Sequence, residues 1–240
     1  MNTTVYFISD LHLGLQNKEA EEIKELKLIQ FLDYINKTGN KLFILGDLFD
    51  YWFEYKYVLQ KGYFNIFTKF KQLTDNGVEI VYLIGNHDFF HNNFFESYLN
   101  VKVVKAEYEL NYENKRFFLG HGDGLVKKDT GYKILKKILR NRLFQFLFYL
   151  IHPDLGISVA KNTSKTSREY TEYKDYGETD GLFETAKIKI DMGYDFVLFG
   201  HSHIRDNKTY KGGQYLNLGT WLNKPCYAKY ENNKLELINW

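Results

Sequence analysis

Five short polar motifs interrupt the apolar stretches of this 240-residue chain, and their side chains are of the types that bind divalent metals and move protons. Each motif follows an apolar run that predicts a buried β-strand. One such motif alone says little, because turns commonly carry Asp, Asn and Gly. Five in succession, each at a strand end, favour one shared site. The motifs are D-x-H at 10–12, GD at 46–47, GNHD at 85–88, GHGD at 120–123 and GHSH at 200–203.

The donor atoms of these motifs are carboxylate oxygens, an amide oxygen and imidazole nitrogens, with no thiolate among them. This set suits ions such as Mn²⁺, Zn²⁺ or Fe²⁺ and disfavours Cu(I) and iron–sulfur clusters. The candidates are too many for one tetrahedral ion, but one bridging carboxylate would let them hold two. Two ions about 3.5–4 Å apart can clamp the attacking and leaving oxygens of a phosphoryl transfer. The candidate ligands are Asp10, His12, Asp47, Asn86, His121, His201 and His203.

The elements around the motifs alternate between strand and helix patterns in the first half of the chain. Apolar runs predict strands at 5–10, 41–47 and 79–85, and helical spacing predicts helices over 18–38 and 57–76. This order is typical of βαβ units with a largely parallel sheet. Ligands of such sheets gather at the carboxyl ends of the strands, so we expect the motifs to converge there.

Residues 127–178 break this alternation and predict a helical insertion, or lid, before the last core strands of a single domain at 1–240. Between 127 and 142 there are seven basic residues against one acid, Asp129, and the run LFQFLFYLI follows. A basic turn leading into an apolar helix can lie on an anionic membrane surface or cover acyl chains. An ordinary core helix with a solvated basic face explains the pattern equally well.

Composition limits the class of protein and its surroundings. The formal net charge of +2 is too small for the whole protein to bind polyanions through its net field. A single cysteine, Cys226, excludes an internal disulfide framework and fits a reducing compartment. The N-terminus lacks the pattern of a signal peptide, and no apolar run reaches the roughly 18 residues of a membrane-spanning helix. We therefore expect a cytoplasmic protein.

The ordered motifs resemble those of the calcineurin-like metallophosphoesterase superfamily, over the whole chain except the insertion. The resemblance implies an α/β double-sheet sandwich flanked by helices and a centre of two divalent ions, with Mn²⁺ preferred. It also implies that His87 faces the substrate phosphoryl group as a catalytic residue and that Asp88 orients His87. The implied ligands are Asp10, His12, Asp47 and His203 for one ion, and Asp47, Asn86, His121 and His201 for the other.

Finer features resemble the UDP-2,3-diacylglucosamine hydrolases of lipid A biosynthesis, notably FISDLHLG, FILGDLFDYWF and HGDGLVKKDTGYK. This resemblance implies hydrolysis of a nucleotide-sugar lipid, UDP-2,3-diacylglucosamine, to UMP and 2,3-diacylglucosamine 1-phosphate. It further implies a cytoplasmic enzyme peripherally associated with the inner face of the inner membrane, with no nucleic-acid partner. The implied substrate contacts are His87, Asp129, Tyr132, Ser167, Arg168 and Lys174.

One departure from that family keeps alternatives open. Its best-known members have GNRD where this chain has GNHD at 85–88. A metallophosphoesterase acting on another pyrophosphate or on a phosphodiester, such as a cyclic nucleotide or nucleic acid, fits the same motifs. A non-enzymatic scaffold with this fold ranks last, because such a scaffold is expected to lose ligands and here all seven remain.

Overall fold

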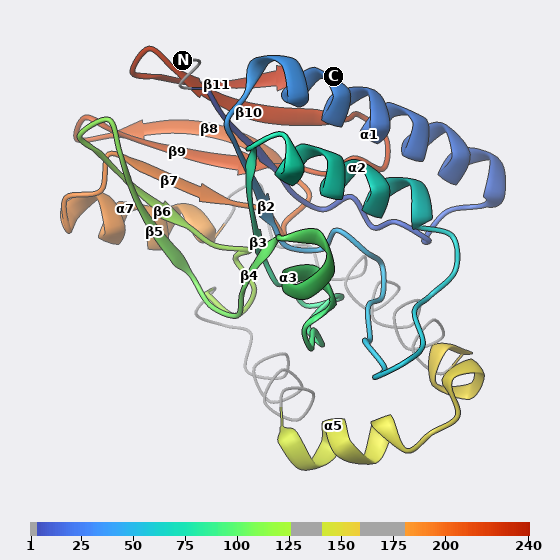
Figure 1. Cartoon of the computed structure of the whole chain (residues 1–240). Coiled ribbons are helices and arrows are strands. Elements are labelled where there is room, and N and C mark those ends of the chain that lie inside the picture. The colour runs from blue at the N-terminus through green and yellow to red at the C-terminus, as the bar shows by residue number, and fades with distance from the viewer. Residues whose placement is uncertain (1–3, 126–140, 159–180) are drawn as a thin grey trace.

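Two mixed β-sheets form the centre of the computed structural model, which describes residues 4–125, 141–158 and 181–240 (Figure 1). The first sheet contains β1 (Val5–Ile8), β2 (Lys41–Leu45), β3 (Glu79–Leu83), β4 (Lys102–Val104), β10 (Cys226–Glu231) and β11 (Lys234–Asn239). The second contains β5 (Tyr108–Tyr112), β6 (Lys115–Leu119), β7 (Phe196–Phe199), β8 (Arg205–Tyr210) and β9 (Gly213–Leu218). Their spatial orders are β11-β10-β1-β2-β3-β4 and β5-β6-β7-β9-β8.

The strands that carry the motifs run parallel within each sheet. β1, β2, β3 and β4 pair in parallel, and so do β6, β7 and β9, whereas β10, β11, β5 and β8 pair antiparallel with their neighbours. Parallel strands place their carboxyl ends at one edge. Antiparallel strands lie at the outside of each sheet, except that the parallel strand β4 forms one edge of the first. The predicted parallel core is therefore confirmed.

The two sheets pack face to face through alternate residues of their strands. In β1, Val5 and Phe7 belong to the apolar cluster between the sheets, and the Phe7 ring lies 6.1 Å from that of Phe117 in the second sheet. Tyr6 and Ile8 point the other way, into the cluster beneath the helices. This period of two follows from the pleat of a strand, and it explains why strands buried on both faces are apolar throughout.

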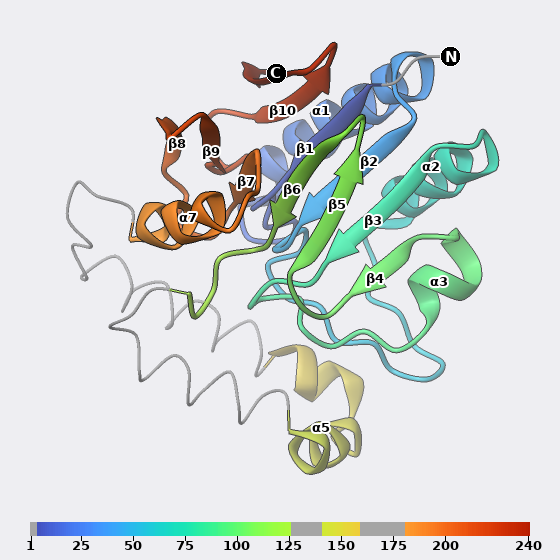
Figure 2. The same cartoon turned by 90° about the vertical axis from the view of Figure 1, so that its left-hand side faces the viewer.

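Helices cover the outer faces of both sheets. The helices are α1 (Lys18–Thr38), α2 (Phe64–Asp75), α3 (Phe94–Leu99), α5 (Arg142–Tyr149) and α7 (Leu182–Asp191). α1 and α2 lie on the first sheet, and α7 packs Leu182, Ala186 and Ile190 against the second (Figure 2). The predicted α/β double-sheet class, flanked by helices, is thus confirmed.

One helix boundary differs from the sequence expectation. α1 begins and ends where predicted, but α2 begins at Phe64 rather than at residue 57. Gly62 has a φ of +106°, which a right-handed helix does not allow, and this places the start of the helix after it. The predicted end near Asn76 is confirmed, because the Asn76 N–H closes the last turn on Gln72 O at 3.1 Å.

Of the predicted insertion at 127–178, the structure describes only residues 141–158, so its limits stay a prediction. α5 lies beyond the edge where the parallel strands end (Figure 2). It contacts the core through the Phe148 ring, 4.6 Å from that of Phe53, and through Tyr149 Oη, which accepts a hydrogen bond from Lys56 N at 2.9 Å. None of the described helices combines the length and the apolarity needed to cross a bilayer.

Candidate metal centre

The motifs meet where the parallel strands of both sheets end. Backbone hydrogen bonds join neighbouring motifs, from His12 N to Asp47 O at 3.0 Å and from Gly200 N to His121 O at 2.9 Å. The approach is close enough that a Cβ at Gly85 would collide with the Asp47 carboxylate. Sequence positions almost 200 residues apart therefore form one rigid cluster of turns.

Several candidate ligands have a left-handed backbone, which is uncommon for a residue with a Cβ. Such conformations persist only where the surrounding structure enforces them, and they concentrate at functional sites. The clustering of strained residues at these turns is an independent sign that the positions of their side chains matter. The residues and their φ values are Asp10 (+53°), His12 (+46°), Asp47 (+50°), His201 (+69°) and His203 (+59°).

A first group of donors contains Asp10, His12 and His203. The two Nε2 atoms of His12 and His203 lie 3.0 Å apart, and Asp10 Oδ1 lies 3.3 Å from His203 Nε2 and 3.8 Å from His12 Nε2. One ligand atom from each residue lies within 4.8 Å of the others, as donors around a common ion must.

A second group contains Asn86, His121 and His201. Asn86 Oδ1 lies 2.9 Å from both His121 Nε2 and His201 Nδ1. Between the groups, Asp47 Oδ2 lies 3.2 Å from His121 Nε2 and 3.8 Å from His12 Nε2. The structure thus brings all seven candidate ligands together and places the Asp47 carboxylate between the two groups.

The charges of the site fit a divalent cation. Burial opposes ionisation of Asp10, yet its contacts with His12 and His203 hold the pKa of its carboxyl well below the usual range. Burial also opposes protonation of His12. The contacts of His12 with Asp10 and Asp50 outweigh this effect and raise its pKa to about 9. Asp10 Oδ1 is buried and accepts no hydrogen bond from the residues that the structure describes. Buried carboxylates need a compensating cation, and this oxygen and nitrogen donor set is one that divalent ions prefer.

His87 lies beside the first group, with its ring centroid 4.9 Å from that of His12 and its side chain 12% exposed. His87 Nδ1 lies 3.0 Å from the carbonyl oxygen of Asp50. In the neutral ring Nδ1 must donate that bond, which leaves Nε2 without a proton. Burial, reinforced by the neighbouring His12, lowers the pKa of His87.

Asp88 was expected to orient His87, which stays a prediction, and the hydrogen bonds that the structure shows for its carboxylate are with other groups. Its buried carboxylate accepts hydrogen bonds from Gly85 N and Leu48 N, both at 2.7 Å, and from the Tyr82 hydroxyl. It therefore joins the GD turn to the GNHD turn, and the structure gives the orienting contact on His87 to Asp50. The reason is geometric, because Asp88 ends the GNHD turn, where its carboxylate lies against the N–H groups of Gly85 in that turn and of Leu48 in the GD turn.

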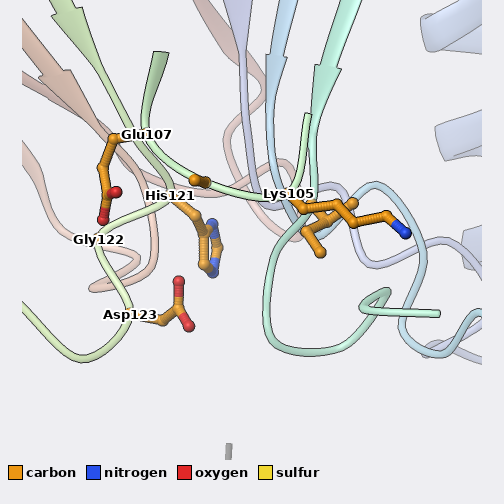
Figure 3. Close-up of a pocket in the computed structure, with 7 residues that line it drawn as sticks. Lys105, Glu107, His121, Gly122 and Asp123 are labelled. Carbon is orange, nitrogen blue, oxygen red and sulfur yellow. The ribbon is translucent and has the colours of Figure 1, made fainter. Parts of the chain in front are cut away.

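A solvent-open hollow of about 90 Å³ borders the second group. Figure 3 shows the carboxylates of Glu107 and Asp123 on either side of the His121 ring, whereas Lys105 extends away from it.

Five of the expected substrate contacts cannot be placed. Asp129, Tyr132, Ser167, Arg168 and Lys174 all lie outside the described residues.

Two residues near the centre were missed in the sequence. Asp50 lies three positions after Asp47, and its Oδ1 is 3.6 Å from His12 Nδ1. Lys24 is buried in α1 and donates to His12 O. The available signal for Lys24 was its place four residues before Leu28, in the buried stripe of the helix.

Comparison with known proteins agrees with this geometry. The family model of the calcineurin-like phosphoesterases matches residues 3–205. A UDP-2,3-diacylglucosamine hydrolase of Porphyromonas gingivalis is 29% identical, over 99% of this chain and 97% of that protein. One of Proteus mirabilis is 27% identical, over 98% of each chain.

Among solved structures, an archaeal phosphodiesterase superposes with a TM-score of 0.50 at 12% identity, covering 99% of this chain and 100% of that one. At this identity the likeness concerns the fold alone. The family model, however, spans most of the chain and includes every motif of the centre. The chain belongs to the calcineurin-like phosphoesterases and is a metal-dependent hydrolase of phosphoric esters or anhydrides.

Proposed function

We propose that this protein is a two-metal hydrolase that cleaves the pyrophosphate of UDP-2,3-diacylglucosamine to UMP and 2,3-diacylglucosamine 1-phosphate. The observation that carries the proposal is the position of Asp47 Oδ2, within 3.8 Å of one donor group and 3.2 Å of the other. Near-full-length similarity to hydrolases of that name supports the choice of substrate. The mixed oxygen and imidazole donors support Mn²⁺ as the ion.

The reaction adds water across one P–O bond of the pyrophosphate. The hydroxyl of water joins the uridyl phosphorus, the bond to the bridging oxygen breaks, and the sugar phosphate departs with that oxygen. When bound, the two ions would supply Lewis acidity to the phosphoryl oxygens and would lower the pKa of water. The first would be held by Asp10, His12, Asp47 and His203, and the second by Asp47, Asn86, His121 and His201.

His87 supplies the protein's own hydrogen-bonding group toward the phosphoryl oxygens. Because Asp50 O fixes Nδ1, the Nε2 atom is the one available to exchange a proton or, when protonated, to donate to an oxygen. A phosphate is already a good leaving group, so we expect His87 to matter more for holding the phosphoryl group than for protonating the product. Asp88 contributes indirectly by holding the two turns that carry Asp47 and His87.

An apolar surface close to the centre supports a lipid substrate. Phe53 and Phe90 follow the GD and GNHD motifs, and their rings stack at 4.1 Å. Phe148 of α5 packs on Phe53, and the rest of α5 leaves large apolar side chains in solvent. These are Leu143, Phe146, Leu147 and Leu150, between 54% and 66% exposed. Acyl chains, together with the surface of the inner membrane, would cover such side chains.

The direct test is a product assay with purified, Mn²⁺-loaded protein. UDP-2,3-diacylglucosamine should yield UMP and the sugar phosphate, and in ¹⁸O-labelled water the label should appear in UMP. UDP-N-acetylglucosamine serves as a control without the two acyl chains and should react far more slowly. Faster turnover of bis(p-nitrophenyl) phosphate or of a cyclic nucleotide than of the lipid would replace this proposal with a general phosphodiesterase.

A further inference from the structure

Lys24 is a charged side chain in the apolar layer between α1 and the first sheet. The side chain is 3% exposed, and Nζ lies 2.9 Å from the carbonyl oxygen of His12 and 2.8 Å from Glu21 Oε1. Burial lowers the pKa of Lys24, with Glu21 and Asp50 opposing this effect. Lysine is rarely buried unless its ammonium group is paired. Met or Leu would fill the same space without this desolvation cost. The presence of a charged residue at this buried position therefore needs an explanation, which the contacts of its ammonium group can give.

Glu21 extends the contact of Lys24 along the same loop. Its Oε2 accepts a hydrogen bond from Gly14 N at 2.9 Å, and its Oε1 accepts one from Gln16 N at 2.8 Å. Lys24 and Glu21 lie three residues apart and therefore on one face of the helix. Together they bind the backbone of residues 12–16 at three points, one carbonyl and two N–H groups.

The first of these contacts is made to the carbonyl group of His12, a residue with a left-handed backbone. His12 has a φ of +46°, and in this conformation its ring nitrogen Nε2 lies 3.0 Å from His203 Nε2. A strained residue keeps its conformation where neighbouring contacts determine it. The carbonyl of His12 accepts its side-chain hydrogen bond from Lys24, so this contact acts directly on the strained peptide.

We propose that Lys24 and Glu21 are positioning residues for the first donor group, because they hold His12 where its Nε2 meets Asp10 Oδ1 and His203 Nε2. The donors of the second group are positioned by other parts of the chain. His121 Nδ1 lies 2.8 Å from Leu45 O, and Asn86 belongs to the GNHD turn. The pair should therefore govern affinity for one ion and leave the other unchanged. This inference rests on the proposed two-ion centre and is independent of the substrate.

The test is to count and titrate Mn²⁺ on the full-length Lys24→Met variant. At a free Mn²⁺ concentration that just fills both sites of the wild type, the variant should retain one ion per chain by elemental analysis. In calorimetric titration one dissociation constant should rise about 10- to 100-fold, the usual loss for a group that orients a ligand. The other constant should stay within twofold.

Lys18→Met is the matched control, because Lys18 lies in the same helix and also pairs with an acid, Glu22, but is 92% exposed. It should bind two ions with wild-type constants. Glu21→Gln is a second variant that tests the same pair if Lys24→Met fails to fold. Glu21 is 20% exposed, and glutamine has nearly the same size, so this change should not disturb folding. This variant should weaken the same ion to a smaller degree.

Two further backgrounds identify which ion is affected. His203→Ala removes a donor of the first group, so adding Lys24→Met or Glu21→Gln to it should cause no further loss of Mn²⁺. His201→Ala removes a donor of the second group, so either change should there weaken the one remaining site by the same factor as it does in the otherwise wild-type chain. This is the logic of a double-mutant cycle.

Equal weakening of both sites, or two unchanged constants in Lys24→Met and Glu21→Gln, would overturn the inference. Because Mn²⁺ is titrated without substrate, failure to hydrolyse the lipid would not count against it. A wild-type chain that binds a single ion would instead contradict the proposed function itself.

Discussion

The turns of the metal centre and α5 differ in which kind of side chain they expose to solvent. In the turns, polar groups are buried and bonded, as with the Asp88 carboxylate, which accepts from two backbone N–H groups at 2.7 Å. In α5, apolar side chains face solvent, with Leu143 66% and Leu147 54% exposed. Catalytic groups need fixed positions, whereas a surface for flexible chains needs only apolar area. We infer that chemistry and substrate choice are assigned to separate parts of the molecule.

This separation can be tested because the contacts that link α5 to the core are few among the described residues. The link consists of the Phe148 and Phe53 rings at 4.6 Å and the hydrogen bond from Lys56 N to Tyr149 Oη, with the small apolar cluster around them. Changes in the turns should therefore affect every substrate. Changes on the exposed face of α5 should affect only lipids.

The largest effect is expected for Asp47→Ala. This change removes the carboxylate whose Oδ2 lies 3.8 Å from His12 Nε2 of the first donor group and 3.2 Å from His121 Nε2 of the second, so both ions should be lost. Activity should fall below about 1% of wild type on every substrate, since even an outer partner of a ligand is worth 10–100-fold. Rates and bound Mn²⁺ are to be measured together. Asp75→Ala, at the exposed end of α2, is the control, and near-normal activity in Asp47→Ala would refute the bridging role.

His87→Ala should reduce activity less, by about 10²-fold, which is the low end for a group that exchanges or donates a proton in the transition state. The physical reason is that the phosphate leaving group needs little assistance. The defect should be similar for UDP-2,3-diacylglucosamine and bis(p-nitrophenyl) phosphate, and both ions should remain bound. A complete loss of activity with both ions present would mean that His87 has a more direct part in the reaction.

Asp88→Asn should lower turnover about 10–100-fold through the turns and not through the His87 ring. The amide keeps one acceptor oxygen, but its NH2 group must face the N–H group of either Gly85 or Leu48. The metal-free protein should therefore lose roughly 1–3 kcal/mol of unfolding free energy, the cost of an unsatisfied buried group. Urea unfolding of the metal-free variant measures this. An unchanged stability would argue that Asp88 acts on substrate instead.

The difference between the regions also shows what can be predicted from the sequence. The convergence of the motifs followed from local patterns, because the carboxyl ends of parallel strands share one edge whatever the details of packing. The partners of Asp88 could not be found this way. One of them is the backbone N–H group of Leu48, 40 residues away, and a backbone N–H group is the same for nearly every residue type.

Burial of single helix residues was also beyond the sequence pattern. Ile23 and Leu26 match helical spacing yet are 53% and 55% exposed, while Lys24 between them is buried. Periodicity indicates that a helix has an apolar face, but the loop packed against the helix decides which side chains it covers. Here that loop carries a carbonyl group that the Lys24 ammonium can bind.

The smallest and most selective effect is expected for Leu147→Glu on the exposed face of α5. Loss of one Leu contact with acyl chains removes about 1.5 kcal/mol of apolar burial, which should raise the KM for UDP-2,3-diacylglucosamine about tenfold. Turnover of bis(p-nitrophenyl) phosphate should not change, and binding to anionic vesicles should weaken in co-sedimentation. Ile188→Glu is the matched control, because Ile188 is 52% exposed on α7 against 54% for Leu147. Equal defects in the two variants, or a defect on the soluble diester, would show that α5 and the centre are not separate.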